Sequence, residues 1–308
     1  MRVATDIGGT FTDLVYLDEN GKIQVAKSHT TPPNFEKGVM NVLKEGGVDL
    51  AGMSTFIHGT TVIINALTER KGAKTGLITT KGFRDVLEIA RGNRPDLFNI
   101  RYKKPEPFVE RYLRQEVEER MNYKGEVLTP LNEEDIKTVV EYFKKEDVEA
   151  IAVCFLHAYA NPAHEKQAVK IIKELWPDVY VTASHEVTKE WREYERTNTA
   201  VFNAYVQPIA TAYIDQLHGE LNEDSPSSQK FIMQSNGGTT TFAEAKKVPI
   251  NMVESGPVAG IYGAAVLGKL IGEKNIIAFD IGGTTAKMSL IENGEVKVST
   301  DYYIEKND

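Results

Sequence analysis

The sequence has a single cysteine, Cys154, and no continuous apolar run long enough to cross a bilayer. A single cysteine cannot form an intrachain disulfide, and a chain without disulfides is typical of a reducing compartment. Asp6 interrupts the first apolar run, which argues against a secretory leader, and a membrane span would need roughly 18 apolar residues. We therefore expect a cytoplasmic protein that makes no contact with a membrane.

The sequence also lacks an excess of basic residues. It has 36 lysine and arginine residues against 44 aspartate and glutamate residues, a net charge of −8. This balance argues against a general nucleic-acid binder that works by neutralising phosphates, so nucleic acid is not an expected partner. Short-period repeats and low-complexity tracts are absent as well. At 308 residues, the chain suits two domains better than one.

The sequence contains one segment in two similar copies. VATDIGGTFTDLVYLDENGK opens the chain and IAFDIGGTTAKMSLIENGEVK stands near its end, so an Asp-Ile-Gly-Gly-Thr motif begins at Asp6 and again at Asp280. Each copy has the pattern of a strand, a glycine turn, a second strand and an Asn-Gly hairpin. One such turn alone could be an ordinary hairpin, but agreement over the whole segment favours a functional duplication.

Between the copies, strand-like and helix-like segments alternate, which is typical of an α/β sheet protein. A helix over 190–221 should bend near Pro208 and connect the two halves. Residues 91–131 show no clear period, so we expect only loops and short strands there. The pattern predicts further strands over 2–7, 14–17, 23–27, 75–79, 148–156, 178–184, 230–235 and 275–281, and further helices over 34–45, 61–70, 131–146, 161–176 and 261–272.

The paired glycines of each motif indicate a phosphate-binding turn. Glycine permits backbone geometry that side chains forbid, so that amide N–H groups can approach an anion closely. Asp6 and Asp280 end their strands where a carboxylate can hold a water of hydrated Mg²⁺, and a cation is needed because carboxylate and phosphate repel each other. Two such loops can face one another across a cleft and bind one nucleoside triphosphate from both sides. The expected nucleotide contacts are Gly8, Gly9, Thr10, Phe11, Thr12, Gly282, Gly283, Thr284 and Thr285.

The two copies are not equivalent. Alignment from the aspartate sets Asp13 opposite Lys287. Asp13 is a candidate for a further carboxylate that faces the metal or positions a water, with a solvated strand carboxylate as the alternative. Asp6, Asp13 and Asp280 are then the expected Mg²⁺ set. Lys287 would suit a phosphate or a surface salt bridge, but we favour a solvated surface lysine.

Longer stretches resemble one enzyme family. HGTTVIINALTERKGAKTGLITTKGFRDVLEIARGNR, CFLHAYANPAHE, REYERTNTAVFNAYVQP and QSNGGTTTFAEAKKVPINMVESGPVAG together are similar to the hydantoinase A, oxoprolinase and ketone carboxylase ATP-binding subunit family. The resemblance implies an α/β fold of the actin-like ATPase (ribonuclease H-like) type, with duplicated phosphate loops and an incomplete second domain. It also implies a first domain over 1–190 with the first loop, and a second over 191–308 with the other.

The same resemblance implies the chemistry. In this family ATP, with Mg²⁺, drives the opening of a cyclic amide such as hydantoin or oxoproline, or the carboxylation of a ketone, after phosphorylation of the carbonyl or enolate oxygen. Such a task requires positioning and charge neutralisation, because phosphoryl transfer passes through a loose transition state. We expect an ATP-dependent cyclic-amide hydrolase. A ketone carboxylase subunit, a small-molecule kinase and a nucleotide-switched binding protein are the alternatives.

Other polar residues lie at the ends of predicted elements. His58, Thr60 and Thr61 stand where a strand becomes a helix and could bind a substrate carbonyl or the transferred phosphate, with a plain helix cap beside a buried histidine as the alternative. Arg91 and Arg94 could supply planar donors to an oxyanion, with a solvated loop as the alternative. The candidate catalytic residues are therefore Asp6, Asp13, His58, Thr60, Arg91 and Asp280.

Three further features fit structural roles at least as well as chemical ones. His157 and His164 lie seven residues apart without a clear third ligand, so structural histidines are favoured over a metal site. Cys154 lies inside an apolar strand, which favours a buried small hydrophobe over a nucleophile. Ser255 and Gly256, in ESGPVAG, could meet the nucleotide or pack a helix closely, and neither role is favoured.

The second loop stands close to the end of the sequence. In the family that the chain resembles, a large part of the protein follows this loop and the nucleotide contacts continue there. Either the sequence is a fragment, or a second subunit or separate C-terminal part completes the fold, because an uncovered hairpin edge should be unstable. We expect weak or absent ATPase activity from this chain alone and association through its last hairpin.

Overall fold

The computed structural model describes residues 1–92, 98–281, 286–299 and 304, and it separates into two compact units. Unit 1 combines Met1–Asn65 with the described residues of Ala210–Tyr302, whereas unit 2 contains Ala66–Ile209. This division is discontinuous and differs from the expected boundary at residue 190. The physical reason is strand pairing: β11 (Gln229–Met233), late in the sequence, pairs in parallel with β4 (Thr55–Thr60), early in the sequence.

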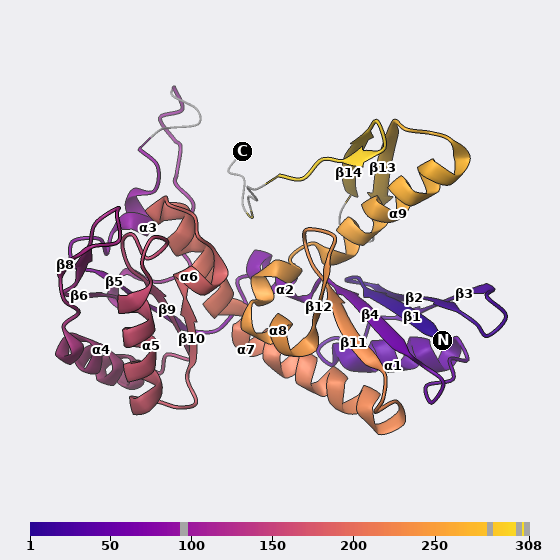
Figure 1. Cartoon of the computed structure of the whole chain (residues 1–308), viewed down its shortest axis with the longest axis horizontal. Helices are drawn as coiled ribbons and strands as arrows, with labels where there is room; N and C mark the ends of the chain where they lie inside the picture. Colours follow the sequence, from indigo (N-terminus) through magenta and orange to yellow (C-terminus); the bar gives the residue numbers. More distant parts are fainter. Residues whose placement is uncertain (93–97, 282–285, 300–303, 305–308) are drawn as a thin grey trace. The chain divides into compact units, whose positions relative to one another are not determined.

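Unit 1 is built on a six-stranded mixed sheet with the order β12-β11-β4-β1-β2-β3 (Figure 1). β1 (Arg2–Ile7), β2 (Phe11–Leu17) and β3 (Ile23–His29) form an antiparallel meander, as the sequence predicted, and β1 pairs in parallel with β4. β12 (Thr239–Thr241) closes the other edge against β11. The meander brings the turn after β1 to one end of the sheet.

The helix α1 (Phe35–Glu45) covers one face of this meander. A side chain at Gly46, which ends α1, would lie 2.4 Å from the Leu14 side chain, and the Tyr16 hydroxyl donates to the Gly46 carbonyl over 2.9 Å. Val3, Ile7 and Leu14 are therefore at most 3% exposed. The opposite face of β1 and β2 carries Asp6 and Asp13.

The second copy of the duplicated segment forms its own three-stranded antiparallel sheet of β13 (Ile276–Ile281), β14 (Ala286–Glu292) and β15 (Glu295–Val296). Its register repeats that of the first copy: Asp6 lies opposite Asp13 in β1 and β2, and Asp280 lies opposite Lys287 in β13 and β14. The long helix α9 (Ser255–Ile271) packs against this sheet (Figure 1). The duplication read from the sequence is thus confirmed down to the pairing of individual residues.

Unit 2 contains a four-stranded parallel sheet with the order β10-β9-β5-β6. β5 (Thr75–Thr80) and β9 (Ala150–Cys154) are buried along their whole length. Burial on both faces explains why β9 is a continuous apolar run, whereas β5 is rich in threonine. The strands β10 (Tyr180–Ala183) and β6 (Arg114–Val117) flank them. Unit 2 also contains α3 (Val86–Ile89), η1 (Arg111–Leu113), β7 (Arg120–Met121), β8 (Val127–Thr129), α4 (Glu133–Lys145), α5 (Ala163–Leu175) and α6 (Ser184–Val187).

The remaining helices follow the predicted pattern with small shifts. α7 (Glu193–Asp224) runs through the boundary between the units, and Pro208, where a bend was expected, lies inside it, directly before that boundary. The other elements are α2 (Val62–Thr68), α8 (Phe242–Lys247) and η2 (Pro249–Met252). Within the described ranges, no helix is both long and apolar enough to cross a membrane.

Candidate functional site

Unit 1 contains a cavity of about 720 Å³ on the acidic face of its sheet. Three carboxylates line it: Asp6 and Asp13 from the first copy of the motif and Asp280 from the second. The rest of the lining is mostly small or apolar, and consists of Ala4, Thr5, Leu14, Val15, Val25, Ala26, Lys27, Ile57, Gly59, Met233, Gly256, Ala259 and Gly260. The tertiary structure therefore brings the two motif copies, 274 residues apart, to a single cavity.

Hydrogen bonds with Phe11 and Thr30 hold the turn after β1 in place. The Gly8 amide donates to the Phe11 carbonyl over 2.9 Å, and the Thr30 hydroxyl donates to the Gly8 carbonyl over the same distance. The Thr30 amide donates to the Thr10 carbonyl over 3.0 Å, so β3 and the residue after it support the turn. Gly9 and Thr10 are exposed. Such a turn presents backbone to a ligand without needing a side chain.

The other two residues expected to touch nucleotide at this turn lie differently. Phe11 is partly exposed, stacks on the His29 ring with 5.0 Å between ring centres, and has the Lys27 ammonium over its ring. Thr12 is fully buried and its hydroxyl lies 3.2 Å from that of Thr30. Because successive residues of a strand point to opposite faces, Thr12 faces α1 and not the cavity. Its role as a nucleotide contact therefore has no support in the geometry.

The Asp6 carboxylate is the most constrained group at the site. Its Oδ1 atom is buried and has no hydrogen-bond partner among the described residues. Burial, followed by the negative charges of Asp13 and Asp280, raises the pKa of Asp6 to about 6, and Lys287 opposes this shift. Negative charge therefore outweighs positive charge around the buried, unpartnered oxygen of Asp6.

The neighbouring carboxylates have different surroundings. Asp13 lies opposite Asp6 across the strand pair, where like charges repel, and the Lys27 ammonium lies 2.8 Å from its Oδ1 atom. Both side chains of this ion pair are about half exposed, so it contributes little to stability. Asp280 is exposed at the end of β13. Within the described residues, no three Asp, Glu, His or Cys side chains converge closely enough to bind one ion directly.

The start of α9 closes the cavity around Asp6. A side chain at Gly256 would lie 2.4 Å from the Asp6 Oδ1 atom, and one at Gly59 would lie 2.6 Å from it. Ser255 joins this helix to β4: its hydroxyl accepts from the Thr60 amide and donates to the Thr60 carbonyl, each over 3.2 Å. Gly256 is therefore required for close packing against a candidate functional carboxylate. The role of Gly59 was missed, although it stands between two residues that the sequence singled out.

Lys287 was expected to be a solvated surface lysine, and this was wrong. Its side chain is only 31% exposed and forms an ion pair with Glu254, whose side chain is 17% exposed. Burial lowers the pKa of Lys287. Glu254 precedes α9 in the left-handed conformation, at φ 60°. The start of α9 thus contacts the first motif copy through Gly256 and the second through Glu254, a connection that no local sequence pattern reveals.

His58 is buried on the core side of the sheet and does not line the cavity. Its ring is fully buried, with Nδ1 2.8 Å from the Thr5 hydroxyl and Nε2 2.5 Å from the Tyr213 hydroxyl. Burial lowers the pKa of His58 to about 3, so the ring is neutral at physiological pH. With both nitrogens occupied, His58 supports β1 from the core side. A catalytic role for it has no support in this geometry.

Thr60 is also buried, and its hydroxyl accepts a hydrogen bond from the Val62 amide over 3.1 Å. Thr61 donates its hydroxyl to the Ile7 carbonyl over 3.1 Å. Both residues therefore cap and anchor the start of α2 beside the first motif. Their positions fit the alternative of a plain helix cap, because neither hydroxyl lines the cavity.

The other candidates belong to unit 2. Arg91 pairs with Glu195, with Nε 2.5 Å from Oε1. His164 lies 2.7 Å from the Glu119 carboxylate, and no metal-binding group of three includes it among the described residues. Cys154 is buried and burial raises the pKa of its thiol, in agreement with a structural role. Arg94, Gly282, Gly283, Thr284 and Thr285 lie outside the described residues.

Comparison with known proteins gives two family matches. Residues 2–176 match the hydantoinase/oxoprolinase N-terminal region, and residues 196–307 match the hydantoinase/oxoprolinase family. An uncharacterised protein of Methanocaldococcus jannaschii is 41% identical over 98% of this chain and 45% of its own length. The caprolactamase alpha subunit of Pseudomonas jessenii is 33% identical over 97% of this chain and 44% of its own length.

Two solved structures are similar along nearly the whole chain. A nucleotide-free structure of acetone carboxylase, described as an enzyme of ATP-dependent acetone carboxylation, has a TM-score of 0.86 at 29% identity over 96% of this chain and 44% of that one. The ATP-dependent caprolactamase from Pseudomonas jessenii has a TM-score of 0.83 at 32% identity, over 94% and 43%. The predicted actin-like ATPase fold class is thereby confirmed. The chain spans less than half the length of these relatives.

The raised pKa of Asp6 predicts an unusual pH dependence. The unfolded chain releases this proton near the ordinary pKa of 3.8, whereas the folded chain holds it to about 6, so ionised Asp6 destabilises the ligand-free fold. Its contribution to the free energy of unfolding should decrease as pH rises between these values. Asp6→Asn should remove that dependence and stabilise the ligand-free protein at neutral pH by up to about 3 kcal/mol.

Urea denaturation of both proteins across this pH range measures the effect. Asp18→Asn is the control, because Gln24 donates a hydrogen bond that lowers the pKa of the exposed Asp18 and gives its contribution the opposite sign. A stability difference between wild type and Asp6→Asn that stays constant with pH would contradict the assignment.

Loss of the Glu254–Lys287 ion pair should loosen the second motif copy. Lys287→Met keeps the length of the side chain and removes its charge, so amide hydrogen exchange in β13 and β14 should accelerate by about tenfold, as expected for a half-buried ion pair. Lys297→Met is the matched control, because the ion pair of Lys297 with Glu292 lies in the same sheet and is mostly exposed. Equal exchange rates in the two variants would refute the connecting role.

Proposed function

Because the chain belongs to the hydantoinase/oxoprolinase family, we propose that unit 1 binds Mg²⁺–ATP and that the protein uses it to phosphorylate the carbonyl oxygen of a cyclic amide, which leads to hydrolytic ring opening. The observation that carries the proposal is the meeting of Asp6, Asp13 and Asp280, from both copies of one motif, at a single cavity. ATP dependence is part of the description of both solved relatives.

The residues present fit a hydrated Mg²⁺ ion. The Asp6 Oδ1 atom is buried without a partner among the described residues, and burial, followed by the negative charges of Asp13 and Asp280, raises the pKa of Asp6 to about 6. A divalent cation would supply that charge and would neutralise the phosphates of the nucleotide. Because the three carboxylates do not converge as direct ligands, Asp6, Asp13 and Asp280 would hold the ion through its waters.

The protein groups around the cation have separate tasks. The exposed backbone of Gly9 and Thr10 would bind phosphate oxygens through amide N–H groups, which requires no movement of side chains, whereas the Gly8 amide is used by the turn itself. Lys27 neutralises Asp13 and leaves Asp6 as the carboxylate with an open oxygen. Val15, Ile57 and Met233 form an apolar part of the cavity wall that suits the uncharged portion of a nucleotide.

A cyclic amide is our first choice of substrate, and a ketone is the second. The relatives include a caprolactamase subunit and 5-oxoprolinases on one side, and acetone and acetophenone carboxylase subunits on the other. Both chemistries begin by activating a carbonyl with ATP, so the nucleotide site does not separate them. The expected cytoplasmic location likewise stays a prediction.

The structure also supports the proposal of a partner polypeptide. One face of the β13–β14 sheet carries Ile277, Phe279, Ile281, Met288 and Leu290, each at least 50% exposed. The register sets Ile277 opposite Leu290 and Phe279 opposite Met288, so these side chains form one continuous apolar surface. A patch of this kind usually marks an interface.

The first motif copy indicates what covers this surface. There, the positions that correspond to Phe279 and Met288 are Thr5 and Leu14, which are at most 4% exposed beneath α1 and its neighbours. We propose that a polypeptide equivalent to the remaining half of the relatives packs an apolar helix on the second copy in the same way. The relatives with subunit names are consistent with assembly from several chains.

Nucleotide binding is tested first. Isothermal titration of the chain with ATP should show binding that requires Mg²⁺, and Asp280→Asn should weaken it about tenfold because one charge beside the cation is lost. Asp18→Asn, in an exposed hairpin, should leave the affinity unchanged. ATP affinity that responds neither to Mg²⁺ removal nor to Asp280→Asn would overturn the nucleotide site.

The partner surface is tested with the C-terminal portion of the Methanocaldococcus jannaschii relative, produced as a separate chain. Mixing should give a one-to-one complex in analytical ultracentrifugation, with ATP turnover above that of the chain alone, which we expect to be weak or absent. Product analysis with caprolactam, hydantoin, oxoproline, and acetone plus bicarbonate then identifies the substrate class. Phe279→Ser should abolish the complex, whereas Ile23→Ser, on an equally exposed strand side chain, should not; self-association in place of the complex would refute this partner.

A further inference from the structure

The parallel sheet of unit 2 has a switch point between β5 and β9. From β5 the chain continues to β6 on one side, and from β9 it continues to β10 on the other, so the loops after these neighbouring strands diverge. In open α/β sheets, ligands bind outside the carboxyl ends of the strands at such a point. This location lies within unit 2 and is separate from the residues that line the cavity of unit 1.

Buried polar contacts fix the strand ends at this point. The Thr80 hydroxyl, at the end of β5, donates to the Glu119 carboxylate, which follows β6, and accepts from the Leu156 amide, which follows β9, over 3.0 Å. His164 lies 2.7 Å from the other Glu119 oxygen. Because Glu119 and Leu156 are both tied to Thr80, the residues that follow each of them, Arg120 and His157, are held at adjacent strand ends.

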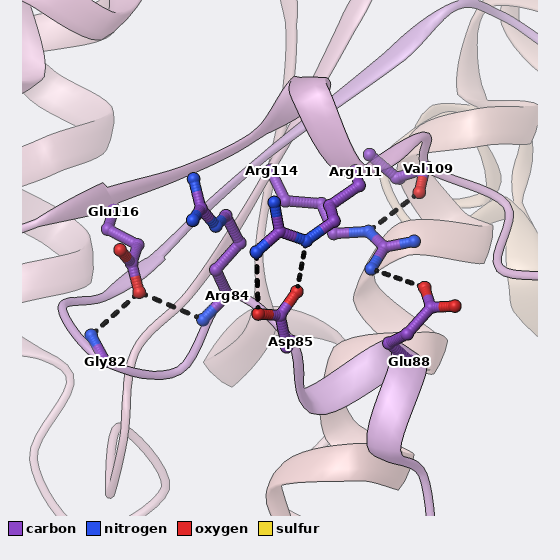
Figure 2. A network of polar contacts seen from close by, with 8 residues as sticks. All are labelled: Gly82, Arg84, Asp85, Glu88, Val109, Arg111, Arg114 and Glu116. Atoms are coloured by element: carbon purple, nitrogen blue, oxygen red, sulfur yellow. Dashed lines mark hydrogen bonds and ion pairs between the residues drawn. The ribbon is translucent and has the colours of Figure 1, made fainter.

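A second network fixes the loop after β5. Glu116 accepts hydrogen bonds from the Gly82 and Arg84 amides over 2.8 and 3.2 Å, as Figure 2 shows. Two arginines of this network are neutralised: Arg111 pairs with both oxygens of Asp85, and Arg114 pairs with Glu88 (Figure 2). Arg84 contributes its backbone amide, and its Nε atom has no partner among the described residues. Arg111 and Arg114 thus differ from the two arginines at the switch point, Arg120 and Arg196, for which the described residues supply no carboxylate partner.

Arg120 and Arg196 carry donors that the chain does not use. The Arg120 guanidinium lies over the Phe83 ring, 5.0 Å from its centre, and forms no hydrogen bond or ion pair with the described part of the chain. Arg196 is 1% exposed, and its acceptors are the backbone carbonyls of residues 155, 190 and 191. Its Nε atom is buried without a partner among the described residues. A fully buried arginine without a carboxylate partner, such as Arg196, is rare because burial of an unpaired charge is costly.

His157 lies beside both arginines and is held in an unusual conformation. Its φ is 58°, in the left-handed region that residues with a β-carbon seldom adopt, and its Nδ1 atom lies 3.2 Å from the Tyr159 hydroxyl. The Arg196 guanidinium lies 5.5 Å from the centre of the Tyr159 ring. Arg196 donates to the carbonyl of Phe155, two residues before His157, and the contacts of Thr80 hold Arg120 at the adjacent strand end. Burial, then the positive charges of Arg120 and Arg196, lower the pKa of His157.

Among the described residues, no acidic side chain forms an ion pair with Arg120 or Arg196. Both oxygens of Glu119 are occupied, by Thr80 and His164, and Glu193 is exposed at the start of α7. We propose that the carboxyl edge of the unit 2 sheet is a second ligand site, in which Arg120, His157 and Arg196 bind a small oxyanion, a carboxylate or a phosphate. Planar guanidinium groups suit this ligand because they donate paired hydrogen bonds to two oxygens.

The site is tested by isothermal titration of the full chain with sodium acetate, bicarbonate or inorganic phosphate, each alone and again with saturating Mg²⁺–ATP. At least one anion should bind with a dissociation constant that Arg120→Gln raises about tenfold or more, as expected for a charge-assisted hydrogen bond. Persistence of this effect in the presence of nucleotide separates the site from the one in unit 1. Because the effect of Arg120→Gln is read without nucleotide as well, it does not depend on whether unit 1 binds ATP.

Matched variants guard against a merely structural effect. Arg70→Gln is the control, because Arg70 also lies over a phenylalanine ring, that of Phe108, but precedes β5 at the amino end of the sheet. His157→Asn keeps a residue that tolerates the left-handed conformation and should weaken binding without lowering the unfolding temperature. The three anions identify the ligand class. Equal affinities for wild type, Arg120→Gln and His157→Asn, or no anion binding to the wild type at millimolar concentration, would overturn the proposal.

Discussion

The close contact between Asp6 and the start of α9 determines how unit 1 is arranged around its cavity. A carboxylate oxygen is buried against the α-carbons of Gly59 and Gly256, where a side chain on either residue would approach it to 2.6 Å or less. The contact leaves Asp6 Oδ1 without a hydrogen bond and raises the pKa of the carboxyl. Such an arrangement is unfavourable in the ligand-free protein, and a cation nearby would reverse the penalty.

The two motif copies treat their charges differently, although their strand register is the same. In the first copy two aspartates face each other, and Lys27 from the third strand relieves the repulsion. In the second copy the lysine stands directly opposite the aspartate and turns toward Glu254. The first copy is therefore acidic and keeps an open oxygen, whereas the second is nearly neutral and anchors the helix. The copies thus share their strand register and differ in charge where Asp13 corresponds to Lys287.

Unit 2 also contains charged groups without a partner of opposite charge, but in this unit the groups are positive. Its buried carboxylates are fully occupied, as Glu165 illustrates by accepting from the Phe155 amide, the Ser184 hydroxyl and the His185 amide. Arg111 and Arg114 are paired with carboxylates, whereas Arg120 and Arg196, at the switch point, have no carboxylate partner among the described residues. Unpaired buried charge is costly, and it marks where a ligand would complete the structure.

Many helices and strands could be predicted from the sequence because local patterns of apolar and turn residues specify them. The strand, glycine turn and hairpin of each copy, the buried strand around Cys154 and the helices over 131–146 and 161–176 were all predicted, since periodicity and turn residues specify them. The short strand β6, within a stretch without clear period, was not assigned a place in the parallel sheet, because only its neighbours give it one. The family and fold class also followed from extended motifs.

The tertiary structure decided what no local pattern encodes. It buried His58 between Thr5 and Tyr213, turned Thr12 toward α1, paired Lys287 with Glu254, and divided the chain into discontinuous units. Each of these depends on contacts between residues far apart in the sequence, whose burial and charge are set by packing. The sequence by itself determined the Asp-Ile-Gly-Gly-Thr motif and its duplication, because strand and turn formation are local. Which side chains face the cavity followed only from the folding of distant segments onto one another.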